Sequence, residues 1–391
     1  MKAVFLLQTD PFHPKPALRA VREAETLREA GWEVSFVSWI KGDEPPPDTP
    51  SPVRVRRILR PVPPLESGIF RRGLAFLYVT RDLSSAVVDE APDLIVAHDF
   101  EVLRAAVAAK KALGVPLLYD SHEDWPALIA ENSLMEARIA GWQERRLCAK
   151  VDHIVTVSAP IASKFRDWGR PTTVIYSARP TREIQLADRS ASRGVFQYAI
   201  DDFVVGFAGT FGAGRGLEVL LHSLGELPGN VKALLVGGPH GDAGHLFQVA
   251  AELGVERRVR LDDYRPFPEL APYYAAMDLG VILLDDRPNH RRALPNKLFD
   301  YMAHGVPVLV PNYPPMRSLV EQTHSGIILE KLDAPALAQT ILEWSRNRTT
   351  LAELGRAGRA HFLNGLAWNI QSVVFLQTAA RLVGVRTAVK T

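Results

Sequence analysis

Glycines, cationic side chains and a carboxylate gather in two segments of the second half of the chain. The segment FAGTFGAGRG (207–216) combines glycines with Arg215, and ALPNKLFDYMAHGVPVLV (293–310) places Lys297 three residues before Asp300. Glycines let the backbone approach a ligand closely, and free amides at a helix start attract anions. The cations would favour phosphate, and Asp300 could accept hydrogen bonds from sugar hydroxyls. These residue types therefore indicate a site for a ligand that contains phosphate and sugar.

Other interpretations of both segments stay open. The glycines of the first segment have the spacing of a Walker A loop, but Arg215 and Gly216 replace the required Lys and Ser/Thr. A glycine-rich turn that only reverses the chain fits that segment about equally well. A lysine and an aspartate three residues apart on a helix are most often an exposed ion pair. A binding role is favoured here because the helix follows a predicted strand.

Histidines and carboxylates follow two predicted strands in the first half. DLIVAHDF places His98 and Asp99 after one strand, and LLYDSHEDW places Asp120, His122 and Glu123 after the next. One histidine at a strand end is usually structural, but two in succession with acidic neighbours favour a functional site. A metal site built from these residues is an alternative, but no HExxH or cysteine spacing supports it. We therefore predict no metal.

Alternating strands and helices must position these residues. The predicted strands are apolar throughout, which is typical of parallel sheets covered on both faces. A helix from about 17 to 30 should end at Gly31. The sequence thus predicts an α/β fold with two doubly wound Rossmann-like domains facing a cleft, with ligands outside the carboxyl ends of the strands. The predicted strands are 3–7, 33–38, 94–97, 117–119, 154–157, 203–208, 233–236, 259–261, 279–284, 306–310 and 327–329.

Length and composition bound the organisation and location of the protein. A chain of 391 residues favours two domains, and the polar stretch 176–193 reads as their linker, which gives domains at 1–180 and 181–366. The net charge of +2 is too small to argue for nucleic acid. A single cysteine excludes an intramolecular disulfide and suits the cytoplasm. No apolar run approaches the about 18 to 20 residues that span a bilayer, so any membrane contact should be peripheral.

A basic stretch interleaved with apolar residues is the candidate surface for an anionic membrane or a phosphorylated acceptor. A solvated surface explains it equally well. The segment before it, 43–52, is rich in proline and is expected to form a stiff exposed loop. The cations of the stretch are Arg54, Arg56, Arg57, Arg60, Arg71 and Arg72.

The order of these motifs resembles the GT-B glycosyltransferases, particularly the retaining family 4. The segment 295–308 carries most of the resemblance, supported by the glycine loop with its basic residue, the VGG strand, ALRAVREAETLREAGWEVSFV and the closing segment AWNIQSVVFLQTAARL. The resemblance covers nearly the whole chain. It implies that 367–391 packs back on the first domain. It also implies metal-independent transfer of a sugar, with retention, from a UDP- or GDP-linked donor to a sugar, lipid-linked or small-molecule acceptor.

The resemblance also implies roles for single residues. Asp300 matches the carboxylate that holds the ribose, Arg215 matches a lysine that binds the donor diphosphate, and His98 matches a histidine that contacts the transferred sugar or the acceptor. We expect catalytic roles for His98, Arg215 and Lys297. Donor binding is expected from Gly209, Thr210, Gly212, Gly214, Asn296, Leu298 and Asp300. Candidates on the acceptor side are Asp10, His13, Asp99, His122 and Glu123.

Some positions depart from the family pattern. Arg292 lies where a sugar-binding glutamate is common, Thr210 lies where an arginine is common, and TDPFHPKP lacks the glycine pair after the first strand. A non-catalytic partner subunit and a nucleotide-sugar epimerase share the architecture and are the alternatives. The retained cations, carboxylate and histidine argue against the first, and the missing glutamate does not favour the second.

Overall fold

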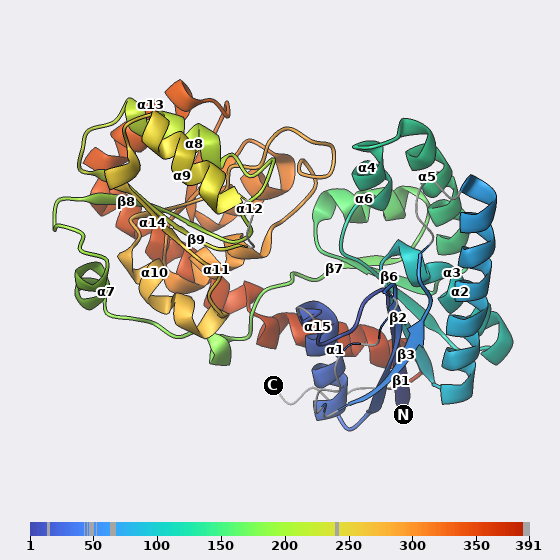
Figure 1. The fold of residues 1–391 in the computed structure, drawn as a ribbon. Helices are drawn as coiled ribbons and strands as arrows, with labels where there is room; N and C mark the ends of the chain where they lie inside the picture. Colours follow the sequence, from blue (N-terminus) through green and yellow to red (C-terminus); the bar gives the residue numbers. More distant parts are fainter. Residues whose placement is uncertain are drawn as a thin grey trace. The chain divides into compact units, whose positions relative to one another are not determined.

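The computed structural model describes residues 1–13, 16–42, 44, 46, 51, 53–62, 68–238 and 242–385. The chain divides into two compact units, which can be followed in Figure 1. Unit 1 comprises Met1–Ser177 and Gln371–Thr391, and unit 2 comprises Ala178–Ile370. Most of the proline-rich loop expected at 43–52 lies outside the described residues.

Unit 1 is built on a parallel sheet whose described strands follow the order β3-β2-β1-β4-β5-β6-β7. The order reverses between β1 and β4, so the residues after these two strands lie at the switch point of the sheet. Helices cover both faces, with α1 on the opposite side from α2 and α3 (Figure 1). The strands are β1 (Lys2–Leu7), β2 (Glu33–Ile40), β3 (Arg54–Leu59), β4 (Leu94–His98), β5 (Leu117–Ser121), β6 (His153–Thr156) and β7 (Thr172–Val174). The helices are α1 (Leu18–Glu29), α2 (Gly68–Glu90), α3 (Phe100–Leu113), α4 (Trp125–Ala130), α5 (Leu134–Cys148) and α6 (Ala159–Asp167).

Unit 2 contains a second parallel sheet, in the order β10-β9-β8-β11-β12-β13, with its switch point between β8 and β11. The glycine segment follows β8, and the helix that carries Lys297 follows β11. The strands are β8 (Phe203–Ala208), β9 (Val231–Val236), β10 (Val259–Asp262), β11 (Leu279–Val281), β12 (Val308–Pro311) and β13 (Gly326–Leu329). The helices are α7 (Arg189–Val195), α8 (Leu217–Gly225), α9 (Asp242–Glu252), α10 (Ala271–Ala276), α11 (Asn296–His304), α12 (Pro314–Thr323), α13 (Ala334–Arg346) and α14 (Arg348–His361), and α15 (Trp368–Leu382) then passes into unit 1.

Burial explains why the strands were readable from the sequence. Every residue of β4, β5 and β8 is buried, as expected for strands covered by helices on both faces. Each unit has its own cluster of buried apolar side chains. The predicted α/β fold with two Rossmann-like domains is confirmed.

Three local features differ from the prediction. The edge strands β3 and β7 were not predicted, because β3 alternates arginine with apolar residues and β7 has three residues. The predicted strand 279–284 is shorter, since β11 ends at Val281. The expected linker contains the first turns of α7, which starts where the Asp188 carboxylate caps the amide of Ala191. None of the helices that the structure describes has the length and apolarity needed to cross a bilayer.

Candidate functional site

The glycine segment after β8 leaves room for a cation. Gly209 has φ +146°, and a Cβ there would lie 2.8 Å from the Nζ of Lys297. Gly214 and Gly216 have φ of +80° and +67°, values that favour glycine. A Cβ on Gly237, after β9, would lie 1.6 Å from the carbonyl oxygen of Gly209. The loops after β8 and β9 therefore pack backbone against backbone, with the ammonium of Lys297 beside them.

Lys297 lies in the first turn of α11 with its Nζ 3.3 Å from the centre of the Phe207 ring. Burial, and then the charge of Arg215, hold the pKa of Lys297 well below its usual value, although Asp300 acts in the opposite direction. Within the described part of the chain, neither Lys297 nor Arg215 forms an ion pair with a carboxylate. Two neighbouring cations without an acidic partner are suited to bind an anion.

Asp300 pairs with a residue other than Lys297. Its Oδ1 lies 3.2 Å from the Nε of Arg179, which also binds Glu183 at 3.1 Å. The guanidinium of Arg179 lies 3.4 Å above the Phe267 ring. The exposed Lys–Asp pair weighed from the sequence is therefore not formed. Sequence reasoning missed Arg179 because a single arginine in a polar segment carries no signal.

The other donor-side candidates differ in exposure. Thr210 and Asn296 are exposed, and Gly212 is half-buried. Leu298 is fully buried and its amide donates to the carbonyl of Pro295, so its side chain belongs to the core of unit 2. Arg292 is exposed.

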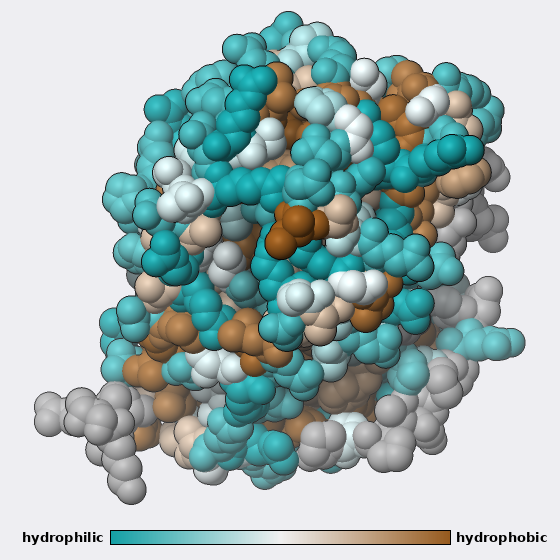
Figure 2. Space-filling model, turned by 90° about the vertical axis from the view of Figure 1, so that its left-hand side faces the viewer, coloured by the Kyte–Doolittle hydropathy of each residue, from teal (hydrophilic) through white to brown (hydrophobic). Residues whose placement is uncertain are grey.

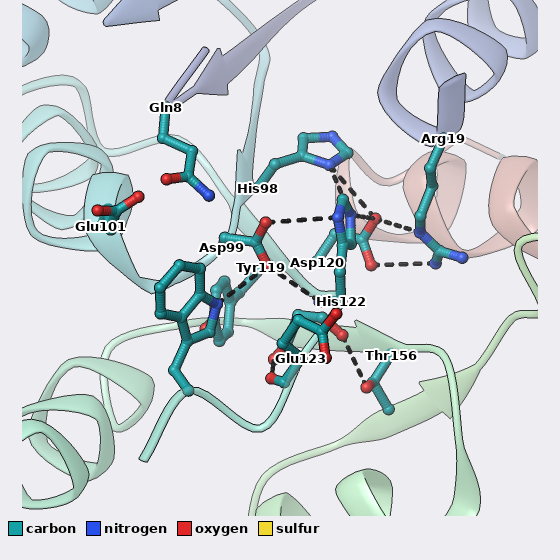
Figure 3. Close-up of polar contacts among 12 residues, drawn as sticks. Gln8, Arg19, His98, Asp99, Glu101, Tyr119, Asp120, His122, Glu123 and Thr156 are labelled. Atoms are coloured by element: carbon teal, nitrogen blue, oxygen red, sulfur yellow. Dashed lines mark hydrogen bonds and ion pairs between the residues drawn. The ribbon is translucent and has the colours of Figure 1, made fainter. Parts of the chain in front are cut away.

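In unit 1, two histidines and an aspartate meet at the carboxyl ends of β4 and β5, as Figure 3 shows. The Nε2 of His122 lies 3.1 Å from the Nδ1 of His98 and 3.0 Å from the Oδ2 of Asp120. The Nδ1 of His98 lies 3.4 Å from the same oxygen. The structure thus brings together the residues that the sequence placed after these two strands.

Arg19 on α1 fixes the charge of this cluster. Its Nε and Nη2 donate to the Oδ2 and Oδ1 of Asp120 at 2.6 and 3.0 Å. Burial would raise the pKa of Asp120, but Arg19 and then His122 hold it well below the usual value. Glu23 lies one turn after Arg19 on α1. Its burial, and then the charge of Asp120, raise its pKa well above the usual value. The surroundings therefore favour the charged form of Asp120 and shift Glu23 towards its neutral form.

The two histidines differ in protonation. Burial is the main reason that the pKa of His98 falls to about 3, and Glu23 lies 3.5 Å from its Nε2. Burial would also lower the pKa of His122, but Asp99 and then Asp120 outweigh it and raise that pKa. Asp99 has φ +68° and accepts hydrogen bonds from the amide of His122 and the indole of Trp125, both at 3.1 Å. His98 is thus a neutral imidazole beside the readily protonated His122.

The same cluster is a possible cation site. His98, Asp120 and His122 each offer one ligand atom, and these atoms lie within 4.8 Å of one another. Glu123 does not belong to this group. Arg19 already places a positive charge against Asp120, which reduces the need for a metal there. That the cluster of His98, Asp120 and His122 binds no metal stays a prediction.

Asp10 is buried directly after β1. Its Oδ1 accepts hydrogen bonds from the amides of Phe12 and His13, and its Oδ2 accepts one from the Nε of Arg57 at 2.7 Å. His13 is half-buried. Asp10 therefore shapes the loop after β1.

The basic stretch is largely neutralised by acidic partners. Arg54 pairs with Glu90, Arg56 with Asp89, Arg57 with Asp10, and Arg60 with Asp82. The side chains of Arg71 and Arg72 lie outside the described residues. The four described arginines thus offer less positive charge to a partner than the sequence suggests.

Comparison with known proteins agrees with this architecture. Residues 16–176 match the family model described as "Glycosyl transferase 4-like domain", and residues 202–347 match "Glycosyl transferases group 1". The chain is similar to D-inositol 3-phosphate glycosyltransferase 1 of Catenulispora acidiphila, with 26% identity over 297 residues that cover 71% of this chain and 69% of the relative. It is also similar to D-inositol 3-phosphate glycosyltransferase of Thermobispora bispora, with 26% identity over 313 residues that cover 75% of this chain and 70% of the relative.

Solved structures share the fold. Sucrose-phosphate synthase from Thermosynechococcus elongatus aligns with a TM-score of 0.79 at 18% identity, covering 98% of this chain and 100% of the other. HepE from Anabaena, in a complex with UDP, aligns with a TM-score of 0.73 at 20% identity, covering 98% of this chain and 100% of the HepE chain. The two family matches and the two doubly wound sheets lead to one conclusion: the chain belongs to the GT-B glycosyltransferases of the family 4 type.

Proposed function

We propose that this glycosyltransferase uses a nucleoside diphosphate sugar as its donor and transfers the sugar to an acceptor hydroxyl with retention of configuration. The observation that carries the proposal is the pair Lys297 and Arg215, which lies beside the glycine loop without an ion-paired carboxylate among the described residues. A diphosphate would supply the negative charge that this pair lacks.

The cations would act mainly in the transition state. As the bond between the anomeric carbon and the diphosphate oxygen breaks, negative charge grows on the leaving group, and Lys297 and Arg215 stabilise that charge. The acceptor oxygen forms the new bond on the same face of the sugar, and its proton passes to the departing phosphate. Side chains thus do what a metal ion does in other transferases.

The ligand classes are part of the same proposal. A UDP- or GDP-linked donor is supported by the fold shared with HepE, whose structure contains UDP. Asp300 would hold the ribose, with Arg179 fixing its orientation. The relatives named for D-inositol 3-phosphate favour a small hydroxylated acceptor, and sugar and lipid-linked acceptors belong to the proposal as well.

Unit 1 would supply the acceptor side of the reaction. Of the two histidines, His122 has the more accessible side chain, at 28% exposed, whereas that of His98 is 2% exposed. We assign the direct contact with acceptor or sugar to His122, and His98 would hold its ring in place. Asp99 would orient the same ring through its other nitrogen, Nδ1, which lies 3.4 Å from the Asp99 Oδ2, and Asp10, His13 and Glu123 are the remaining candidates.

Calorimetry with UDP and GDP tests the proposal. The native chain should bind one of them, and Lys297→Ala should weaken that binding at least tenfold, the scale of about 1.4 kcal/mol for a lost charged contact. Lys331→Ala is the matched control, because Lys331 is an exposed lysine of the same unit that pairs with Asp333. If neither nucleotide binds, or if Lys297→Ala binds as well as the control, the donor site is wrongly assigned.

Metal independence has its own test. Transfer from the nucleotide sugar, or its slow hydrolysis, should persist in excess chelator because Lys297 and Arg215 supply the positive charge. A complete loss of activity that added metal restores would reject this mechanism.

A further inference from the structure

Helix α5 presents large apolar side chains to solvent. Leu134, Met135, Ile139 and Trp142 are 70, 67, 49 and 59% exposed. The opposite side of the helix packs inward through smaller side chains and the buried Glu144. A contiguous apolar face of this kind usually marks a surface that contacts a partner or a membrane.

Three arginines share that face. At about 100° per residue, the four apolar side chains span an arc of about 140°, and Arg138, Arg145 and Arg146 lie within this arc. All three are exposed, and in the part of the chain that the structure describes none of them forms an ion pair with a carboxylate. The guanidinium of Arg146 lies 4.7 Å from the centre of the Trp142 ring. The face is therefore both apolar and cationic.

Acidic residues are kept off this face. Glu136 lies outside the arc on the helical wheel. Glu144 is buried and is neutralised by Lys164 at 2.9 Å. This contrasts with the basic stretch, whose arginines at 54, 56, 57 and 60 each pair with a carboxylate. Among the described residues, α5 thus gathers three exposed arginines without a carboxylate partner on one apolar face, whereas the four described arginines of the basic stretch are paired.

We propose that the α5 face, defined by Leu134, Met135, Arg138, Ile139, Trp142, Arg145 and Arg146, docks unit 1 on an anionic lipid bilayer. The apolar side chains would enter the boundary between headgroups and acyl chains, where tryptophan is favoured. The arginine stems would lie along the apolar surface while the guanidinium groups reach lipid phosphates.

A second copy of the chain fits this face poorly. A symmetric dimer places the same patch on both partners, so the arginines of one α5 would face the arginines of the other. Anionic lipid removes this repulsion, and a continuous bilayer needs no shaped pocket. The residues of the docking face all lie on α5, so this proposal does not depend on the donor site proposed for unit 2.

Sedimentation with vesicles tests the docking face without any sugar substrate. The full chain should bind vesicles of phosphatidylglycerol and phosphatidylcholine much more tightly than vesicles of phosphatidylcholine alone. The triple variant Arg138→Gln/Arg145→Gln/Arg146→Gln should weaken this binding by about a hundredfold, since each arginine near an anionic surface contributes about fivefold. Trp142→Ser should weaken it by about tenfold through loss of buried apolar area.

Matched controls come from unit 2. Arg257, Arg346 and Arg356 are exposed arginines, and Phe247 is 57% exposed. The triple variant Arg257→Gln/Arg346→Gln/Arg356→Gln and the variant Phe247→Ser should bind anionic vesicles as the native chain does.

Several results would overturn the proposal. These are failure of the native chain to bind anionic vesicles, equal binding to neutral vesicles, and equal losses in the α5 variants and the controls. Light scattering that shows an oligomer dissolved by Trp142→Ser would assign the face to a second copy instead. Circular dichroism should show native folding in every variant, because all the altered side chains are exposed.

Discussion

At the scale of single residues, the half-buried Lys297 shows how the environment of a side chain sets its pKa. Burial and Arg215 both favour the neutral amine, so its pKa lies well below the usual value. A bound diphosphate would favour the charged form and raise that pKa again. The donor site is therefore expected to take up a proton when it binds its ligand.

Proton uptake can be measured by calorimetry in buffers of different ionisation enthalpy. At about pH 8 a free nucleoside diphosphate is already fully ionised, because its last phosphate pKa is about 6. From about pH 8 upwards, the native chain should take up increasing amounts of proton on binding UDP or GDP, because the diphosphate raises the lowered pKa of Lys297. Lys297→Met should show no uptake. Equal uptake by both proteins would assign the proton to another group.

Asp300 should contribute a charged hydrogen bond to the donor. Asp300→Ala is expected to weaken nucleotide binding by about 1.5 to 3 kcal/mol, and Asp300→Asn by less, because the amide keeps an acceptor oxygen. Calorimetry on both variants measures the difference. Unchanged affinity in Asp300→Ala would leave the carboxylate with the structural role of holding Arg179.

His98 should make the protein less stable in mild acid. Its neutral ring is buried against Glu23, Arg19, Asp120 and His122, and its pKa in the folded chain is about 3. Below its ordinary pKa of about 6.5, the unfolded chain binds a proton that the folded chain does not. The free energy of unfolding should therefore fall, by about 1.4 kcal/mol per pH unit from this residue, as the pH drops from about 6.5 towards 3.

Denaturant titrations between about pH 4.5 and 6.5 check this expectation. His98→Asn should unfold with a shallower dependence on pH than the native chain, whatever its absolute stability. An identical slope in the two proteins would show that His98 does not stay neutral in the folded state.

At the scale of elements, two glycine loops hold the donor site together. A Cβ on Gly237 would lie 1.6 Å from the carbonyl oxygen of Gly209, so Gly237→Ala must push apart the loops after β8 and β9. We expect a loss of stability of about 1 to 3 kcal/mol and weaker nucleotide binding, because the Gly209 backbone moves away from Lys297.

Gly229→Ala is the control for this substitution. A Cβ at Gly229 meets nothing within 4 Å, so the variant should keep both stability and affinity. Thermal unfolding and calorimetry on the two variants make the comparison. A Gly237→Ala protein that binds nucleotide normally would show that these loops do not form the phosphate site.

At the scale of the whole molecule, the two units should contribute to different steps. The cations lie in unit 2, and the histidine cluster lies in unit 1. His98→Ala should leave nucleoside diphosphate affinity nearly intact while lowering turnover, because it acts after the donor has bound. Arg215→Ala and Lys297→Ala should lower both. Loss of nucleotide binding in His98→Ala, or full activity in that folded variant, would refute this division.

The sequence by itself determined the fold class and the places where chemistry could occur. Continuous apolar runs such as β4 and β8 record burial on both faces of a sheet, which is a local property that any reader of the sequence can recognise. Parallel strands put their carboxyl ends at one edge, so His98 and His122 were expected together, and the structure places their nitrogens 3.1 Å apart. The edge strand β3 escaped prediction because it is half exposed and charged.

Only the tertiary structure decided which charges are paired. Arg19 and Asp120 are 101 residues apart in sequence, and Arg179 and Asp300 are 121 apart, yet each pair is in contact. Periodicity reports which side of an element is buried, but it holds no information about which distant side chain fills the space opposite. For the same reason Arg56 and Arg60 of the basic stretch looked available and proved to be paired, while the arginines of α5 drew no notice and prove to be exposed on an apolar face.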